Sequence, residues 1–359
     1  MLMSELQLSL LIIGVVVVGV VLLYNGYQER QLRRRMGEAF SKAHDDVLLG
    51  ASATDTGSSA RMEPQLTPLG ETPVSASKAV PEPPPEMAGI DETIDCVATL
   101  TSETPLTAMQ VSELLSGVAA CGRSWRAAGF NAATGKWEEI NRAVTAQYSQ
   151  LRLALQMVNR GGAVSPVQLS AFCDAVQAAA TRTSGAAQCP DADSVLRRAH
   201  DLDRFCADVD VAIGMNVIAA EGDTFHGARV RALAESEGLS LEPDGVFHYE
   251  GEQGQPLLTL NNREAEPFLP ERISGMTTRG LTLLLDVPRV ALSEHALQRM
   301  FEIGKSLSVT LKGRLVDDNR TALTADSMDK IREQMKDIHF AMNQRGIVPG
   351  SVRALRLFS

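Results

Sequence analysis

Residues 281–308 read LTLLLDVPRVALSEHALQRMFEIGKSLS and combine a strand pattern with a helix pattern. The run from Gly280 to Val287 is almost entirely apolar, which predicts a buried strand. Ser293 then supplies a favourable residue for a helix N-terminus, and apolar residues recur at helical spacing to about Leu307. A buried strand followed by an amphipathic helix predicts an α+β fold in which helices cover one face of a sheet.

The same plan occurs earlier in the chain, where residues 151–180 read LRLALQMVNRGGAVSPVQLSAFCDAVQAAA. Here Ser165 and Pro166 predict the start of the helix. Each half also opens with a strand and a helix, predicted at 94–100 and 109–118 in the first half and at 209–218 and 227–237 in the second. We interpret this order as an internal duplication. The alternative is a chance similarity between two α+β segments, since few identities are shared.

The N-terminus carries an uncharged apolar run from Leu6 to Tyr27, followed by Arg30, Arg33, Arg34 and Arg35. As a helix, this run is long enough to cross a bilayer. Positive charge after the run and Glu5 before it predict an N-terminus outside and residues 30–359 in the cytoplasm. A cleaved signal peptide is the alternative, but no positive charge precedes the run.

Composition changes along the chain predict its division into parts. Between the basic flank and Ile90 the sequence is rich in Ala, Ser, Thr and Pro, which is typical of a disordered linker. The predicted parts are an anchor with its basic flank (1–36), a linker (37–87), a first α+β unit (88–204), a second α+β unit (205–345) and a C-terminal tail (346–359).

Charge and residue spacing exclude several classes of function. A formal net charge of −10 disfavours sequence-independent nucleic-acid binding. The five cysteines are odd in number and contain no CxxC pair, so we expect reduced thiols, no metal site and no cofactor. Common catalytic motifs are absent, and Asp317 and Asp318 suit a strand-end turn better than acid–base chemistry, so we expect no enzyme. Trp125 and Trp137 are expected in the core or at its rim.

Three stretches of the second unit resemble the C-terminal domain family of the bacterial cell-division protein ZipA. An MNV strand at 215–217 precedes small residues at Gly222 and Gly227. A closing pattern of strand, D-D-x-R turn and helix covers 315–338. Between them, the pattern F-x-P-E, T-T-x-G and a strand ending in V-P is carried by Phe268, Pro270, Glu271, Thr277, Thr278, Gly280, Thr282, Val287 and Pro288.

The resemblance implies an antiparallel sheet of the split β-α-β type, with helices on one face and an apolar cleft on the other. In the family, that cleft binds the C-terminal peptide of FtsZ, the polymer of the division ring. Asp244 and Arg263 stand where the family tends to have methionine, and Leu284 replaces an aromatic residue, so the apolar part of the cleft is smaller. Matched by position, the cleft would use Val217, Asp244, Val246, Asn261, Arg263, Thr282 and Leu284.

The resemblance and the N-terminal run together predict a single-pass protein of the inner membrane, with a periplasmic N-terminus and a position at mid-cell. Its partners would be the FtsZ peptide, inner-membrane lipid and other division proteins. Strands that are apolar on both faces leave open whether the second face meets a peptide or the other unit. The rival hypothesis is a membrane-tethered sensor or envelope scaffold that binds a protein or ligand and has no affinity for FtsZ.

Overall fold

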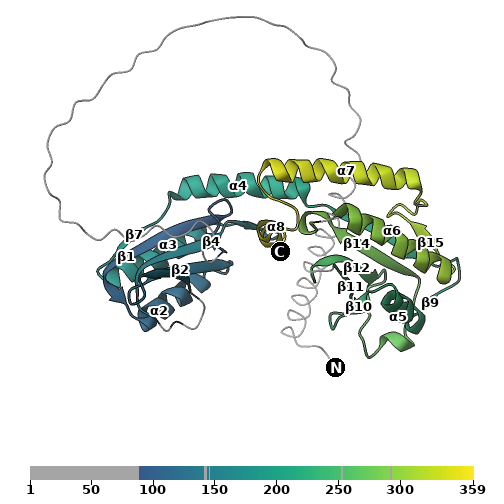
Figure 1. Ribbon diagram of the computed structural model, residues 1–359, viewed down its shortest axis with the longest axis horizontal. Coiled ribbons are helices and arrows are strands. Elements are labelled where there is room, and N and C mark those ends of the chain that lie inside the picture. Colours follow the sequence, from purple (N-terminus) through teal and green to yellow (C-terminus); the bar gives the residue numbers. More distant parts are fainter. Residues whose placement is uncertain (1–88, 141–143, 145, 252–253, 292) are drawn as a thin grey trace, which may run out of the picture. The chain divides into compact units, whose positions relative to one another are not determined.

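The computed structural model describes residues 89–359, apart from 141–143, 145, 252–253 and 292. Two large apolar cores lie in this part of the chain, and each is formed by one antiparallel sheet and its helices (Figure 1). We call them the first unit and the second unit. The prediction of an α+β fold with antiparallel sheets is confirmed. The predicted anchor and linker lie outside the described residues.

The first unit contains a five-stranded sheet in the order β3-β2-β4-β1-β7. All of its strand pairs are antiparallel. A short two-stranded ladder, β5-β6, follows β4. The elements are β1 (Asp95–Leu106), α2 (Ala108–Ala119), β2 (Trp125–Asn131), β3 (Lys136–Glu139), β4 (Tyr148–Gln156), β5 (Val158–Asn159), β6 (Gly162–Ala163), α3 (Pro166–Arg182), β7 (Ala186–Gln188) and α4 (Ala192–Val209).

The second unit contains a six-stranded antiparallel sheet in the order β10-β11-β12-β14-β8-β15, and a short β13-β9 pair. Its first elements are β8 (Ala212–Ile218), β9 (Phe225–His226), α5 (Gly227–Ser236), β10 (Ser240–Leu241), β11 (Phe247–Glu250) and β12 (Pro256–Asn262). Its remaining elements are η2 (Ile273–Gly275), β13 (Thr277–Thr278), β14 (Gly280–Asp286), η3 (Val287–Arg289), α6 (Ser293–Thr310), β15 (Arg314–Val316) and α7 (Ala325–Gln344). The chain then ends with α8 (Val352–Leu357).

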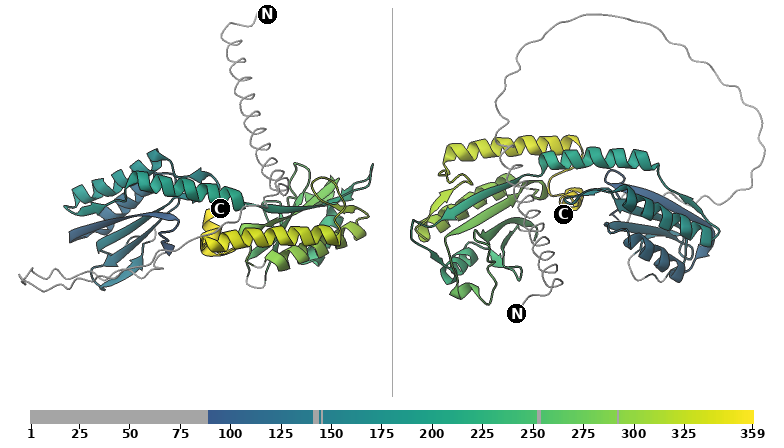
Figure 2. Two further views of the ribbon diagram at one scale, coloured as in Figure 1. Left: turned by 90° about the horizontal axis from the view of Figure 1, so that it is seen from above. Right: turned by 180° about the vertical axis from the view of Figure 1, so that it is seen from behind.

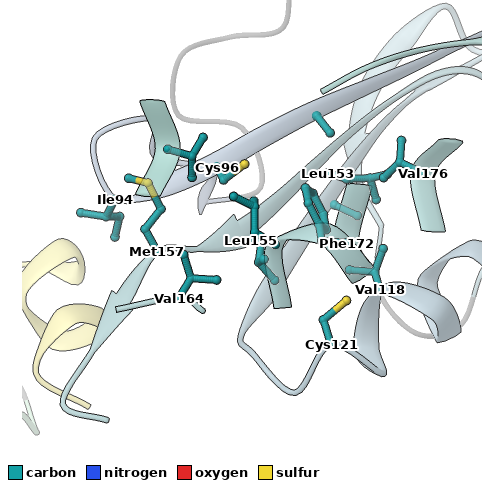
Figure 3. Packing of buried hydrophobic residues seen from close by; sticks show 14 of the residues in the cluster. Ile94, Cys96, Val118, Cys121, Leu153, Leu155, Met157, Val164, Phe172 and Val176 are labelled. Atoms are coloured by element: carbon teal, nitrogen blue, oxygen red, sulfur yellow. The ribbon is translucent and has the colours of Figure 1, made fainter. Parts of the chain in front are cut away.

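The core of the first unit packs alternate residues of its central strands against α2, α3 and α4. Figure 3 shows Cys96 of β1 and Leu153 and Leu155 of β4 beside Phe172 and Val176 of α3. Alternate side chains of a strand point to opposite faces, so a single face of the sheet supplies this core. The five cysteines are all free thiols. Trp137 is buried and Trp125 half-buried, as predicted for core or rim positions.

Local helix signals in the sequence operate as predicted. The Ser165 hydroxyl accepts a hydrogen bond from the backbone N–H of Gln168, and the Gln168 side chain accepts one from the Ser165 backbone N–H. This reciprocal capping box satisfies two backbone donors that the helix leaves unpaired, and Pro166 occupies the first turn. Thr107 and Gln110 form the same arrangement at the start of α2.

Helix α4 is not among the helices predicted from the sequence. It crosses residue 205, where the boundary between the two α+β units is predicted. The second unit therefore starts with β8 at Ala212, three residues after Val209 ends α4, rather than with a strand from 209. Helices α4 and α7 contact each other (Figure 2). At the end of α7, the Arg345 guanidinium lies 4.7 Å from the ring centroid of Phe205 and 2.8 Å from the Asp201 carboxylate.

The C-terminal tail belongs to the core of the first unit. Ile347, Ala354, Leu357 and Phe358 are fully buried there, although the sequence between the tail and that core forms the whole second unit. The Arg356 guanidinium binds both carboxylate oxygens of Asp95, and Arg353 binds Asp91 in the same way. The tail is therefore an integral part of the first unit.

The two units share only part of their topology. In each, an opening strand pairs on one side with the strand before the second helix and on the other side with the strand after it. The strands in between are arranged differently: β2 lies next to β4, whereas β12, the last strand of a β10-β11-β12 meander, lies next to β14. The duplication stays a prediction.

No helix within the described residues is long and apolar enough to cross a membrane. The run from Leu6 to Tyr27, on which the prediction of a span rests, lies outside those residues.

The half-buried His339 should make the stability of the protein depend on pH. Burial lowers the pKa of His339 below its ordinary value of 6.5, although the Glu294 carboxylate opposes this shift, and His339 Nε2 lies 2.7 Å from the Ser293 hydroxyl. Because the unfolded chain binds the proton more readily, the stabilisation is complete above about pH 7 and is lost as the pH falls through the folded-state pKa. We expect His339→Gln to reduce the loss of stability between pH 7 and pH 5 in urea titrations. An unchanged difference between the two pH values would contradict this role.

Candidate functional site

Strand alternation gives the second sheet one face toward the helices and one face away from them. On β14, Leu281, Leu283 and Leu285 are fully buried in the helix-side core. Thr282 and Leu284 therefore point to the other side, and Leu284 is 37% exposed. We call this second side, opposite α5 and α6, the open face.

Three of the predicted site residues lie together on the open face. Asn261 of β12 is paired with Thr282 of β14, and Thr259 is paired with Leu284 one step along the same strands. Directly paired residues of neighbouring strands have adjacent side chains on one face. Asn261, Thr282 and Leu284 therefore form the centre of the candidate site.

Arg263, Asp244 and Val246 lie at the borders of this centre. A Cβ atom placed on Gly280 would lie 2.9 Å from Cδ of Arg263, so the arginine side chain crosses the strand end where glycine leaves room. The Asp244 carboxylate accepts a hydrogen bond from the Val246 backbone N–H at 3.0 Å. Its other oxygen lies 3.3 Å from Nε2 of His248, whose strand neighbour is Thr259. Asp244 and Val246 are thus brought to the open face through the turn before β11.

Val217 does not belong to this site, and its assignment is wrong. It is paired with Leu281, is fully buried and packs in the helix-side core. Because side chains alternate with a period of two, the β8 residues that share the open face with Thr282 are Asn216 and Ile218. The apolar residues Ile213 and Met215 likewise pack under the helices rather than forming a second apolar surface.

A polar network covers the β8 side of the open face. The Thr282 hydroxyl donates to Oδ1 of Asn216 at 2.7 Å, and Nδ2 of Asn216 donates to Asp318 at 2.8 Å. Both carboxylate oxygens of Asp318 lie 3.3 Å from the position that a Cβ atom on Gly214 would occupy. The predicted turn residue Asp318 therefore lies over β8, and the open face is more polar than an apolar cleft.

Two arginines lie at one end of the open face, on either side of the buried residue Ile218. Ile218 is paired with Gly280, which Arg263 crosses, and on its other side with Arg314. Both arginines are exposed, and neither forms an ion pair within the part of the chain that the structure describes. A peptide carrying an apolar side chain and carboxylates would match Leu284 together with these two cations.

Sequence reasoning missed Asn216, Ile218, His248, Arg314 and the contact made by Asp318. The alternation of strand residues could have identified Asn216 and Ile218. Side chains of β8 that share a face with Thr282 must alternate with Val217, which is paired with Leu281. No such signal exists for Asp318, whose side chain reaches β8 from a turn more than a hundred residues away in sequence. Among the described residues, no group of three His, Cys, Asp or Glu side chains is placed to hold a metal ion.

Comparison with known proteins covers the second unit. Residues 211–334 match the model of the family described as ZipA, C-terminal FtsZ-binding domain. A cell division protein ZipA from Marinobacter nauticus is 26% identical over 135 residues, which is 36% of this chain and 39% of the relative. The Pseudomonas aeruginosa protein is 26% identical over 135 residues, 36% of this chain and 47% of the relative. The match with each relative thus spans less than half of that relative's length. Residues 211–334, which include β8, β14 and the open face, are therefore a domain of the ZipA C-terminal family.

Proposed function

We propose that this chain tethers FtsZ polymers to the bacterial inner membrane at the division site. The observation that carries the proposal is the position of the open face within residues 211–334, the segment that matches an FtsZ-binding domain family. The function requires no catalysis, since the tether acts by binding alone.

The proposed ligand of the open face is the C-terminal peptide of FtsZ. Leu284 offers an exposed apolar contact at the centre of the face, and Arg263 and Arg314 offer cations at one end. Apolar anchors supply most of the energy of such interfaces, whereas charges at the rim mainly fix orientation and association rate. Asn261 and Thr282 would add hydrogen bonds to the peptide, while Val217 supports the sheet from the other side.

The N-terminal run from Leu6 to Tyr27 would provide the membrane anchor, and residues 37–87 the connection. A flexible chain of that length has a root-mean-square reach of roughly 40 Å, so the folded units would stay near the bilayer without lying on it. FtsZ polymers present many tails to many anchored domains. Weak individual contacts would therefore add up to stable attachment through high effective concentration.

A second candidate function is a membrane-tethered scaffold or sensor that binds another ligand. A cavity in the first unit, lined by charged and apolar residues, favours a ligand there. A ligand in the cavity would not by itself exclude binding of FtsZ, because the cavity and the open face belong to different units.

Fluorescence microscopy of the tagged full chain tests the proposed function. The division-ring tether predicts a ring at mid-cell, and Leu284→Glu should lose the ring while keeping membrane staining. Val309→Glu is the matched control, because Val309 is 72% exposed on α6 and lies outside the open face. Even membrane staining of the wild-type protein throughout division would contradict the proposal and favour a scaffold without affinity for FtsZ.

A further inference from the structure

The first unit contains a cavity of about 350 Å³, lined by the face of its sheet that points away from the core, by residues 188–190 and by Arg198 of α4. Cys96, Ala98 and Leu100 of β1 are buried in the core, so Val97 and Thr99 point to the opposite side and line the cavity. Thr99 is paired with Arg152 on β4 and with Gln188 on β7, and both also line it. Cavities that bind small ligands measure about 300–1,000 Å³.

The charges around this cavity leave one guanidinium without a carboxylate. Asp95 is buried, and both of its carboxylate oxygens are bound by Arg356. The Glu92 carboxylate pairs with Arg152. Arg198 of α4 lines the cavity, but among the described residues it donates only to the backbone oxygen of Glu92. Of the two arginines that line the cavity, Arg198 is therefore the one without a carboxylate partner among the described residues.

Arg152 supplies a second and independent indication of an anionic ligand. Its Nε atom is buried and has no hydrogen-bond partner. A buried donor without an acceptor is unfavourable, and structures normally satisfy such a donor with protein, water or ligand. The carboxylate that now holds Arg152 belongs to Glu92, whose side chain is 74% exposed and is therefore free to move aside.

The other lining residues restrict the type of anion. Val97 and Pro190 provide apolar contacts beside the two arginines, so the ligand should combine an anionic head with a short apolar group. One guanidinium without a carboxylate partner, that of Arg198, matches a monoanion and disfavours a phosphate, which carries close to two negative charges at neutral pH. Planar guanidinium groups bind planar carboxylates through paired hydrogen bonds.

We propose that this cavity binds a monocarboxylate that carries a short apolar group, held by Arg198 and Arg152. The site lies in the first unit and does not depend on binding of FtsZ by the second. A free small acid and the C-terminus of a peptide share this chemistry.

Ligand-observed saturation-transfer NMR on the full chain in detergent tests the proposal with three probes: butyrate, the tripeptide Gly-Gly-Val, and its C-terminal amide. We expect at least one free carboxylate to bind and the amide not to bind. Stronger binding of the tripeptide would identify a peptide C-terminus as the ligand, and binding of butyrate alone would identify a free acid. Absence of binding by both carboxylates, or equal binding of the amide, would overturn the proposal.

Arg198→Gln should weaken binding of the carboxylate at least tenfold. Arg197→Gln is the matched control, because Arg197 is the neighbouring exposed residue of α4, carries the same charge and does not line the cavity. Both replaced side chains are exposed, so circular dichroism should show unchanged folding. Equal binding by the two variants would contradict a specific role for Arg198.

Discussion

Deletion of residues 346–359 is expected to unfold the first unit while the second unit remains folded. The deletion removes Ile347, Leu357 and Phe358, all fully buried in the core of the first unit. Truncation of one such side chain to alanine costs about 2–5 kcal/mol, so the loss of three approaches the whole stability of a typical domain, about 5–15 kcal/mol. Hydrogen exchange should show loss of protection in β1 and β4 and retained protection in β14. Continued protection of β1 and β4 would contradict the assignment of the tail to this core.

Single substitutions at the end of the chain test whether the burial of individual side chains, rather than the length of the tail, stabilises the first unit. Phe358→Ala should lower the free energy of unfolding of the first unit by about 3–5 kcal/mol. Leu355→Ala is the matched control on the same short helix, because Leu355 is 36% exposed and its replacement should cost about 1 kcal/mol or less. Equal losses in urea titrations of the two variants would contradict the packing described for α8.

Val217→Glu is expected to destabilise the second unit rather than to remove a binding contact. Val217 is fully buried between β14 and β15, with neighbours Leu281 and Leu315 in the strand register. An unpaired carboxylate in such a core costs about 3–5 kcal/mol, or becomes protonated at a similar cost. The variant should therefore show a lower midpoint of thermal unfolding and fail to bind ligands because it is unfolded.

Leu284→Glu introduces the same charge on the other face of the same sheet. Leu284 is 37% exposed, so its replacement should change the free energy of unfolding by about 1 kcal/mol or less. The pair thus distinguishes the two faces by stability alone, without any ligand. If Leu284→Glu were the more destabilising variant, the strand register described for β14 would be wrong.

The sequence predicts those features that local chemistry determines. An almost continuous apolar run identifies β14, and Ser165 with Pro166 identifies the start of α3, because both signals lie within a few residues. Helix α4 also has a readable pattern, since Val195, Ala199, Leu202, Cys206 and Val209 are its buried residues at helical spacing. That pattern crosses the predicted unit boundary at residue 205, and its last residue, Val209, falls within the strand predicted at 209–218.

Features that depend on long-range packing could not be predicted in this way. The few apolar residues of the tail do not indicate which core they join, because both units offer a similar apolar environment. The side chain of Val217 was placed on the wrong face because family matching by position ignores the pairing with Leu281. Resemblance thus identified the domain and six residues near its open face, whereas strand register was needed to decide which side chains share a surface.

Titration of a fluorescent peptide of the FtsZ C-terminus with the full chain, followed by anisotropy, measures directly whether the open face binds FtsZ. We expect saturable binding that Leu284→Glu weakens about tenfold or more, since loss of a central apolar anchor typically costs more than 1 kcal/mol. Val309→Glu on α6 should bind as the wild type does. Absence of saturable binding by the folded wild-type chain, or equal affinity of the Leu284→Glu variant, would contradict the claim that the open face binds FtsZ.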